Sequence, residues 1–110
     1  MFDDVQADPF TIVAEPNRRR ILDELAAGEC AVGVLVDRLG MSQPTVSKHL
    51  KVLRDAGFVS ARVDAQQRIY RVEAKPMREL DRWIARYRRF WTGHLDALED
   101  FLDEEHPDDV

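Results

Sequence analysis

Several classes of protein are excluded by what this sequence lacks. Its 110 residues contain one cysteine, Cys30, so a single copy can form neither an internal disulfide nor a metal site built from cysteines alone. Apolar runs are only a few residues long, which excludes a transmembrane helix and any membrane partner. The first residues are acidic and lack the basic and then apolar pattern of a signal peptide. These absences predict a cytoplasmic protein.

Residue patterns of catalysis are missing as well. The chain has 5 glycines and no glycine-rich phosphate loop, no nucleophile motif and no clustered acid–base pair. Ser47 and His49 are two positions apart on an expected helix, so they do not face each other. The sequence therefore predicts that the protein is not an enzyme and holds no cofactor.

Charge is distributed unevenly along the chain, whose net charge is −5. Residues 38–89 hold 13 Lys and Arg against 5 Asp and Glu, whereas residues 90–110 hold 8 Asp and Glu and no basic residue. A basic middle between acidic ends is typical of a domain that presents one face to a polyanion. An ordinary solvated surface is the alternative. Residues 106–110 are expected to form an acidic tail.

Proline and glycine mark the ends of four expected helices in the first half of the chain. Proline suits the first turn of a helix and glycine its end, and apolar residues recur at helical spacing between them. Ser42 is placed to cap the fourth helix, and Pro44 is tolerated in its first turn. The expected helices cover residues 9–14, 16–28, 31–39 and 43–56, and Gly40, Met41 and Ser42 form the turn between the last two. Two β-rich stretches, 58–63 and 68–72, then predict a hairpin with a polar connector.

One long helix is expected at the C-terminal end. Apolar residues recur at alternating spacings of three and four up to Phe101, which predicts a helix over residues 76–105. Such a helix is about 45 Å long, whereas a small domain is roughly 30 Å across, so a second copy of the helix is its simplest cover. A helix that breaks near Gly93 and folds back is the alternative. The expected dimer interface comprises Phe10, Leu80, Trp83, Ile84, Tyr87, Phe90, Trp91, His94, Leu98 and Phe101.

The centre of the chain has the pattern of a DNA-binding helix-turn-helix followed by a wing. A short helix, a three-residue turn with glycine and a second helix form that motif, and the second helix enters the major groove. Gln43 can pair with adenine, Thr45 can contact a thymine methyl group, and Lys48 can contact guanine or phosphate. The candidate DNA-binding residues are Ser42, Gln43, Pro44, Thr45, Ser47, Lys48, His49, Lys51 and Arg54, with Arg62, Gln66, Gln67 and Arg68 in the wing. An ordinary solvated turn is the alternative for the two wing glutamines.

The expected second helix of this motif reads Ser-Gln-Pro-Thr-Val-Ser-Lys-His-Leu from Ser42 onward. With residues 15–22 and 35–59, it resembles the ArsR/SmtB family of bacterial winged-helix transcriptional repressors. The resemblance implies a mainly α fold with a small β-hairpin wing, a homodimer through the first and last helices, and repression by occupying a promoter. The family's wing carries glycine near its tip, where this chain has Ala65. The expected domain covers residues 1–105, with the helix-turn-helix at 31–56, the wing at 58–72 and the dimerisation helix at 76–105.

Many relatives in this family release DNA when they bind a metal, but this chain lacks the ligands of their usual sites. Asp81 and His94 share part of the spacing of one site, two turns later, yet two ligands do not complete a metal site. The chain therefore resembles a branch without the metal-binding motifs, and no metal is expected. The positions of the usual ligands fall on Ala31 and Gly33 in one site and on Ala74, Pro76, Tyr87 and Phe90 in the other.

The signal to which such a regulator responds is left open by the sequence. Cys30 is a candidate thiol sensor because a thiol near a helix N-terminus has a lowered pKa, and a small, partly buried apolar residue is the alternative. His94 is expected to be a hydrogen-bonded interface residue rather than a ligand. The aromatic cluster around Trp83 and Trp91 is most simply dimer core, or else it lines a pocket for an apolar effector.

Together these patterns predict a sequence-specific DNA-binding transcriptional regulator. The expected protein is a dimeric repressor, and its partners are double-stranded DNA and a second copy of the chain. The resemblance implies that it could repress its own gene, because members of that branch are often autorepressors. The operator is expected to be an inverted repeat with half-sites about 10 bp apart. The alternatives are a thiol- or ligand-responsive sensor of the same family and a winged-helix module that binds proteins. A repressor is expected in the cytoplasm, at the nucleoid.

Overall fold

The computed structural model describes residues 8–105, and within them the side chains of all but residues 94–97, 100 and 103–105. The chain divides into two compact units, one up to Leu80 and one from Asp81, and each is described by itself. The single domain over residues 1–105 stays a prediction. The predicted acidic tail lies outside the described residues. No helix in the described part is long and apolar enough to cross a membrane.

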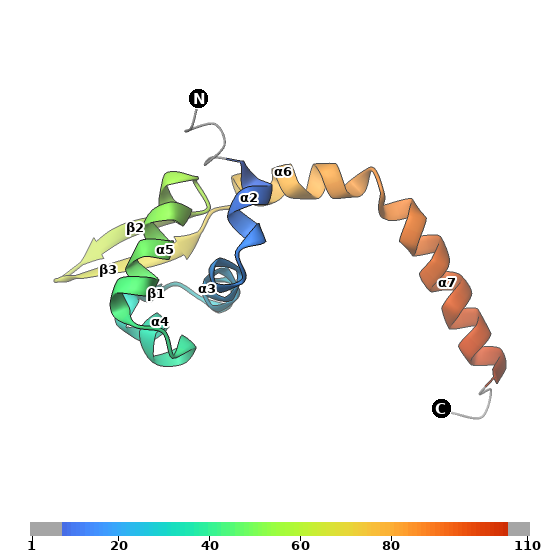
Figure 1. Ribbon diagram of the computed structural model, residues 1–110, viewed down its shortest axis with the longest axis horizontal. Coiled ribbons are helices and arrows are strands. Elements are labelled where there is room, and N and C mark those ends of the chain that lie inside the picture. The colour runs from blue at the N-terminus through green and yellow to red at the C-terminus, as the bar shows by residue number, and fades with distance from the viewer. Residues whose placement is uncertain (1–7, 106–110) are drawn as a thin grey trace. The chain divides into compact units, whose positions relative to one another are not determined.

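Four helices make up most of the first unit, and residues that favour helix ends bound them (Figure 1). The helix α4 ends at Gly40, whose φ of 68° lies in the left-handed region and whose amide donates to the Val36 carbonyl. The next helix, α5, begins after Ser42, whose hydroxyl oxygen accepts a hydrogen bond from the Thr45 amide. These caps confirm the predicted turn between the two helices. The four helices are α2 (Pro9–Ala14), α3 (Pro16–Ala27), α4 (Val32–Leu39) and α5 (Gln43–Asp55).

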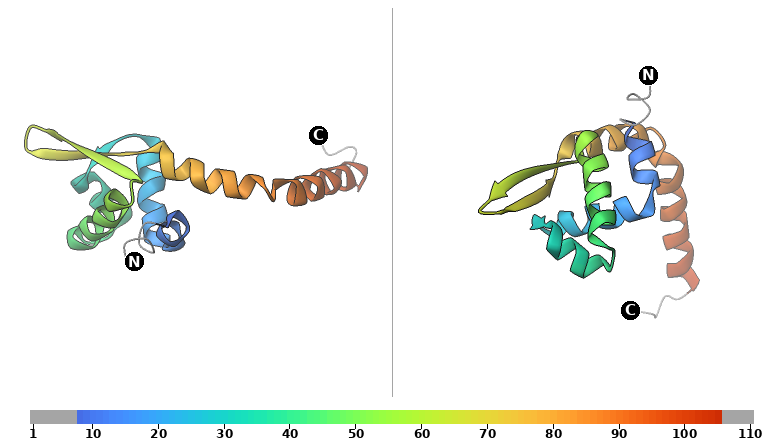
Figure 2. Two further views of the ribbon diagram at one scale, coloured as in Figure 1. Left: turned by 90° about the horizontal axis from the view of Figure 1, so that it is seen from above. Right: turned by 60° about the vertical axis from the view of Figure 1, so that its left-hand side comes forward.

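An antiparallel sheet of three strands, in the order β1-β3-β2, completes the first unit. The strands β2 (Val59–Asp64) and β3 (Gln67–Val72) form the predicted hairpin, which extends beyond the helices of this unit (Figure 2). Strand β1 (Cys30–Ala31) pairs with β3 and was not predicted, because two residues carry no periodicity. It joins the start of the helix-turn-helix to the wing.

The hairpin turns over two residues, Ala65 and Gln66, since Asp64 and Gln67 are paired. Both strands are therefore one residue longer toward the turn than predicted. Ala65 has a φ of 58°, in the left-handed region that favours glycine, at the tip where the family's wing carries glycine. A non-glycine residue in this region costs about 1–2 kcal/mol, which the paired strands offset.

The core of the first unit joins helices, hairpin and helix-turn-helix into one cluster. Each fully buried Leu, Ile or Phe side chain contributes about 1.5–3 kcal/mol. Because these side chains come from all four helices and from both strands of the hairpin, the cluster fixes α5 against the wing. The buried residues are Ile12, Ile21, Leu22, Leu25, Leu35, Val46, Leu50, Leu53, Phe58, Val59 and Tyr70.

The C-terminal part contains two helices where one was predicted. They are α6 (Ala74–Ala85) and α7 (Arg88–Glu105), separated by a turn at Arg86 and Tyr87. The continuous helix over residues 76–105 is therefore wrong, and the break does not lie near Gly93, as the alternative had it. The reason is that the apolar spacing continues through the break, where neither proline nor glycine signals it.

Side-chain contacts join the end of α6 to the beginning of α7 across the turn. Asp81 accepts a hydrogen bond from Arg88 at 2.7 Å. The ring of Tyr87 lies 4.9 Å from that of Trp83 and 6.2 Å from that of Phe90, both in tilted arrangements. The aromatic residues thus pack locally around the turn, a geometry in which such pairs contribute about 0.5–1.5 kcal/mol each.

Candidate nucleic-acid interface

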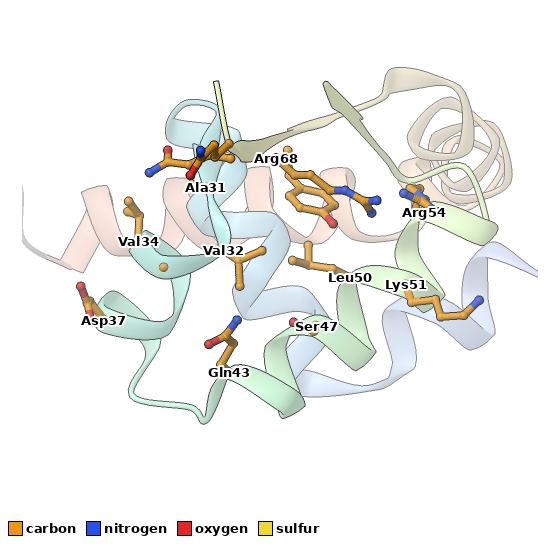
Figure 3. A pocket seen from close by; sticks show the side chains of 14 residues that line it. Ala31, Val32, Val34, Asp37, Gln43, Ser47, Leu50, Lys51, Arg54 and Arg68 are labelled. Atoms are coloured by element: carbon orange, nitrogen blue, oxygen red, sulfur yellow. The ribbon is translucent and has the colours of Figure 1, made fainter. Parts of the chain in front are cut away.

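A groove of about 690 Å³ lies between α4, α5 and the hairpin of the first unit (Figure 3). Val32, Leu50 and Tyr70 give it an apolar lining, and polar side chains from three elements surround that lining. The groove brings together a large part of the candidate DNA-binding set. Its polar and charged residues are Asp37 from α4, Gln43, Ser47, Lys51 and Arg54 from α5, and Gln66, Gln67 and Arg68 from the hairpin.

The groove residues of α5 form one row because their spacing follows the helical repeat. They lie four, four and three positions apart, so they share a face that runs about 16 Å along the helix. Val46, Leu50 and Leu53 point into the core and hold the helix in place. The row is exposed over its whole length, from Gln43 to Arg54.

The two faces of the hairpin carry different arginines. Arg68 pairs with Val63 and Tyr70 pairs with Ala61, and side chains alternate along each strand, so Arg68 shares the face of the buried Tyr70. Arg62 pairs with Ile69 and lies on the opposite face. Arg62 therefore does not line the groove with Arg68, and its DNA contact stays a prediction.

Carboxylates neutralise the arginines of this outer hairpin face. Arg62 forms an ion pair with Glu29 and lies 3.7 Å from Asp64, and the hydrogen bond to Glu29 raises the pKa of Arg62. Arg71 donates to Glu73 at 3.1 Å, and hydrogen bonds from Ser60 and Arg71 lower the pKa of Glu73. The outer face therefore offers little net positive charge to a polyanion.

The cations of the groove are less compensated. Neither Arg54 nor Arg68 forms an ion pair with any residue in the described part of the chain. Lys51 lies 3.0 Å from Asp55, but both side chains are mostly exposed. Exposed pairs of this kind are worth about 0–1 kcal/mol, so Lys51 can exchange its partner for a phosphate. Positive charge is thus available on the groove side of the hairpin.

The first turn of α5 uses part of the candidate set for its own structure. The Ser42 hydroxyl donates to the Thr45 hydroxyl at 2.8 Å, in addition to capping the helix. Pro44 occupies the first turn, and Lys48 is exposed on the neighbouring face of the helix. These four residues do not line the groove, although they are sequence neighbours of Gln43 and Ser47, which do.

His49 contacts the protein rather than the groove. Its Nε2 atom lies 3.7 Å from a carboxylate oxygen of Glu15, and its side chain is only 17% exposed. Burial raises the pKa of Glu15, but amide hydrogen bonds from Asn17 and Arg18, together with the charge of His49, lower it overall. His49 therefore joins α5 to the beginning of α3, and its DNA contact stays a prediction.

Cys30 is a partly buried residue packed against the core. Burial raises the pKa of its thiol, and Arg38 offsets this only in part. This direction is opposite to the lowered pKa expected of a thiol near a helix N-terminus, because the side chain packs against the core from β1. The alternative, a small apolar residue, describes it better.

We expect Cys30 to react with iodoacetamide at pH 7 more slowly than free cysteine does. The thiolate is the reactive form, and a raised pKa leaves less of it at neutral pH, so the rate should rise as the pH approaches 9 and above. Mass spectrometry of timed samples measures the rate, and the protein unfolded in urea is the control. A folded-state rate equal to that of the unfolded chain would contradict the burial of this thiol.

The candidate dimer residues differ in their surroundings. Leu80 packs against the core of the first unit, whereas the remaining described members are exposed. The side chain of His94 lies outside the described residues. Among the described residues, no three His, Cys, Asp or Glu side chains gather into a group that could hold a metal ion. The exposed members are Phe10, Trp83, Ile84, Tyr87, Phe90, Trp91, Leu98 and Phe101.

Comparison with known proteins agrees with this geometry. Residues 15–61, which contain the helix-turn-helix, match the family model described as bacterial regulatory protein, arsR family. The HTH-type transcriptional regulator Rv2034 of Mycobacterium tuberculosis is 36% identical over 96 residues, which cover 87% of each chain. The chain belongs to the ArsR family.

Solved structures of ArsR-like regulators have the same fold as this ArsR-family protein. A possible transcriptional regulator for arsenical resistance is 35% identical with a TM-score of 0.65, over 84% of this chain and 94% of the other. The transcriptional repressor BigR from Xylella fastidiosa is 35% identical with a TM-score of 0.60, over 76% of this chain and 84% of the other. The predicted winged helix-turn-helix is therefore confirmed.

This ArsR-family protein is a DNA-binding transcriptional repressor. Its relatives are transcriptional regulators, which confirms the prediction that it is not an enzyme. The helix-turn-helix consists of α4, the turn at Gly40 and α5, and the wing is the hairpin of β2 and β3. The wing and α5 border one groove, as expected of elements that contact the same duplex.

Two features of the interface were not predicted from the sequence. Asp37 lines the groove, and its position on the expected helix 31–39 could have indicated a place beside the next helix. Glu29 neutralises Arg62 from a segment 33 residues away, and no local pattern signals such a contact. The groove thus contains a negative charge, Asp37, that the sequence analysis did not place there. The wing has one uncompensated cation fewer than predicted, because Arg62 is paired with Glu29.

Proposed function

We propose that the protein acts as a homodimer that represses transcription, including that of its own gene, by occupying an inverted-repeat operator in the cytoplasm, at the nucleoid. The observation that supports this most strongly is the groove, which Arg54 of α5 and Arg68 of the wing both line, neither of them paired with a carboxylate in the described part of the chain. A duplex carries one phosphate charge per about 1.7 Å of its axis, so a surface of this kind finds many partners on DNA.

The proposed contacts divide according to the chemistry of the side chains. Gln43 and Ser47, in the first half of α5, are proposed to contact base edges, because the N-terminal residues of a recognition helix enter the major groove. Phosphates are the proposed partners of Lys51, Arg54 and Arg68. Further contacts are proposed for Gln66 and Gln67 at the wing tip and for Ser42, Pro44, Thr45 and Lys48 at the exposed edge of α5.

The exposed apolar side chains support the homodimer. The second unit leaves Trp83, Phe90 and Trp91 between 42% and 56% exposed, which is unusual for large aromatic residues. A second copy is the proposed cover, with Phe10 of the first unit as a further member of the interface. The remaining proposed members are Leu80, Ile84, Tyr87, His94, Leu98 and Phe101.

We expect the protein to bind DNA from its own upstream region more tightly than a scrambled duplex of the same composition. Fluorescence anisotropy at several salt concentrations measures both affinities, and light scattering of the complex is expected to show two protomers per duplex. Each neutralised phosphate adds roughly −0.9 to the slope of log affinity against log salt. A slope near zero would argue for a winged-helix module that binds proteins. One protomer per duplex would argue against the homodimer.

A further inference from the structure

The groove carries one carboxylate among its cations. Asp37 is exposed, lines the groove and forms no ion pair within the described part of the chain. Its neighbour Arg38 does not compensate it, because that guanidinium lies 3.5 Å from Glu24. No described cation therefore pairs with this carboxylate at the place where a polyanion is proposed to bind.

Asp37 lies away from the basic end of the groove. Figure 3 shows it on α4, across the groove from Lys51 and Arg54, with Gln43 at the first position of α5 between them. The row from Gln43 to Arg54 is about 16 Å long, and the Debye length is about 8 Å at physiological salt. Arg54, two Debye lengths from Gln43 along this row, therefore does little to offset a negative charge at the Gln43 end.

The two ends of the groove consequently suit different parts of a duplex. A phosphate beside an uncompensated carboxylate is repelled, whereas a base edge that presents an amino group can donate a hydrogen bond to it. Among the bases, cytosine presents only its amino donor at this edge, and Asp and Glu are its usual acceptors. The amide of Gln43, at the same end, likewise suits a base edge.

We propose that Asp37 is a specificity-determining residue, which accepts a hydrogen bond from a cytosine amino group and keeps phosphates away from the Gln43 end of the groove. This inference rests on the proposed operator binding. A carboxylate in this position weakens binding to DNA in general and favours registers that place cytosine beside it. It therefore widens the difference between operator and random sequence.

The test compares Asp37→Asn with Asp23→Asn in the full chain. Asp23 is an exposed carboxylate on α3 outside the groove, so both variants change the net charge equally. Anisotropy measures binding to the upstream operator, to a scrambled duplex and to operators with single base-pair substitutions. Asp37→Glu keeps the charge and is expected to keep the preference. Circular dichroism checks that each variant is folded.

For Asp37→Asn we expect the ratio of operator to scrambled affinity to fall by about a hundredfold, because a homodimer loses one base contact in each half-site and each contact is typically worth about tenfold. The Asp37→Asn variant should also lose its discrimination at one C·G pair in each half-site. For Asp23→Asn, the affinity ratio and the discrimination at that pair should both stay within about twofold of wild type. Equal gains on both duplexes, or equal behaviour of the two variants, would overturn the role of Asp37 while leaving operator binding intact. A wild-type protein that binds both duplexes alike would overturn the proposed function, and this inference with it.

Discussion

Replacing Arg54 and Arg68 together by alanine is expected to weaken operator binding about a thousandfold at 0.15 M salt. Two lost phosphate contacts per protomer reduce the salt slope by about 1.8, and by about 3.6 for a dimer. The ionic contribution vanishes near 1 M salt. Between 1 M and 0.15 M salt, a slope difference of about 3.6 corresponds to a loss of about three decades of affinity. Anisotropy titrations across a range of salt concentrations measure both quantities.

The matched control is the double replacement of Arg62 and Arg71 by alanine. It removes the same charge from the same hairpin, but from the outer face, where Glu29 and Glu73 already neutralise it. We expect less than about a threefold loss of affinity, because such exposed ion pairs contribute little. Equal losses for the two double variants would mean that total charge, rather than the groove, determines DNA binding.

Replacing Phe58 by alanine is expected to reduce the free energy of unfolding by about 3–5 kcal/mol. Phe58 is completely buried, and its backbone joins α5 to the sheet. Its amide donates to the Leu53 carbonyl at 2.8 Å, and its carbonyl accepts from the Glu73 amide at 2.8 Å. Single domains are typically stable by about 5–15 kcal/mol, so this variant should lose a large part of its stability. Urea denaturation followed by circular dichroism measures the change.

Val63→Ala serves as the control for the effect of truncating an apolar side chain. Val63 lies on the neighbouring strand but is 73% exposed, so its loss should change stability by no more than about 0.5 kcal/mol. If Phe58→Ala were as mild as Val63→Ala, the cluster around Phe58 would not be the core that holds α5 against the wing.

The helix ends were predictable because their signals are local. Pro16, Gly40 and Ser42 act through their own backbone or through a bond to a residue three or four positions away. The break at Arg86 and Tyr87 has no such signal, since the apolar spacing is the same on either side of it. Packing of aromatic rings, which depends on three-dimensional contacts, accompanies that break.

The sequence predicted which types of residue form the candidate interface, but not which of them lie on each face of the hairpin. The sequence places Arg62 and Arg68 in one hairpin, yet the face of each depends on the register, which the two-residue turn fixes. The pair of His49 with Glu15 and that of Arg62 with Glu29 join segments more than 30 residues apart. Such contacts follow from the packed core, which no short stretch of sequence describes.

The unequal neutralisation of the two hairpin faces also affects the approach to DNA, before any contact is made. Within about a Debye length of the duplex, phosphates attract the groove side of the wing more strongly than its outer side. The resulting torque rotates the domain during diffusion, so that a larger fraction of collisions begins in a productive orientation. We expect Glu29 and Glu73 thereby to increase the rate of association without touching DNA, and salt to reduce this advantage first.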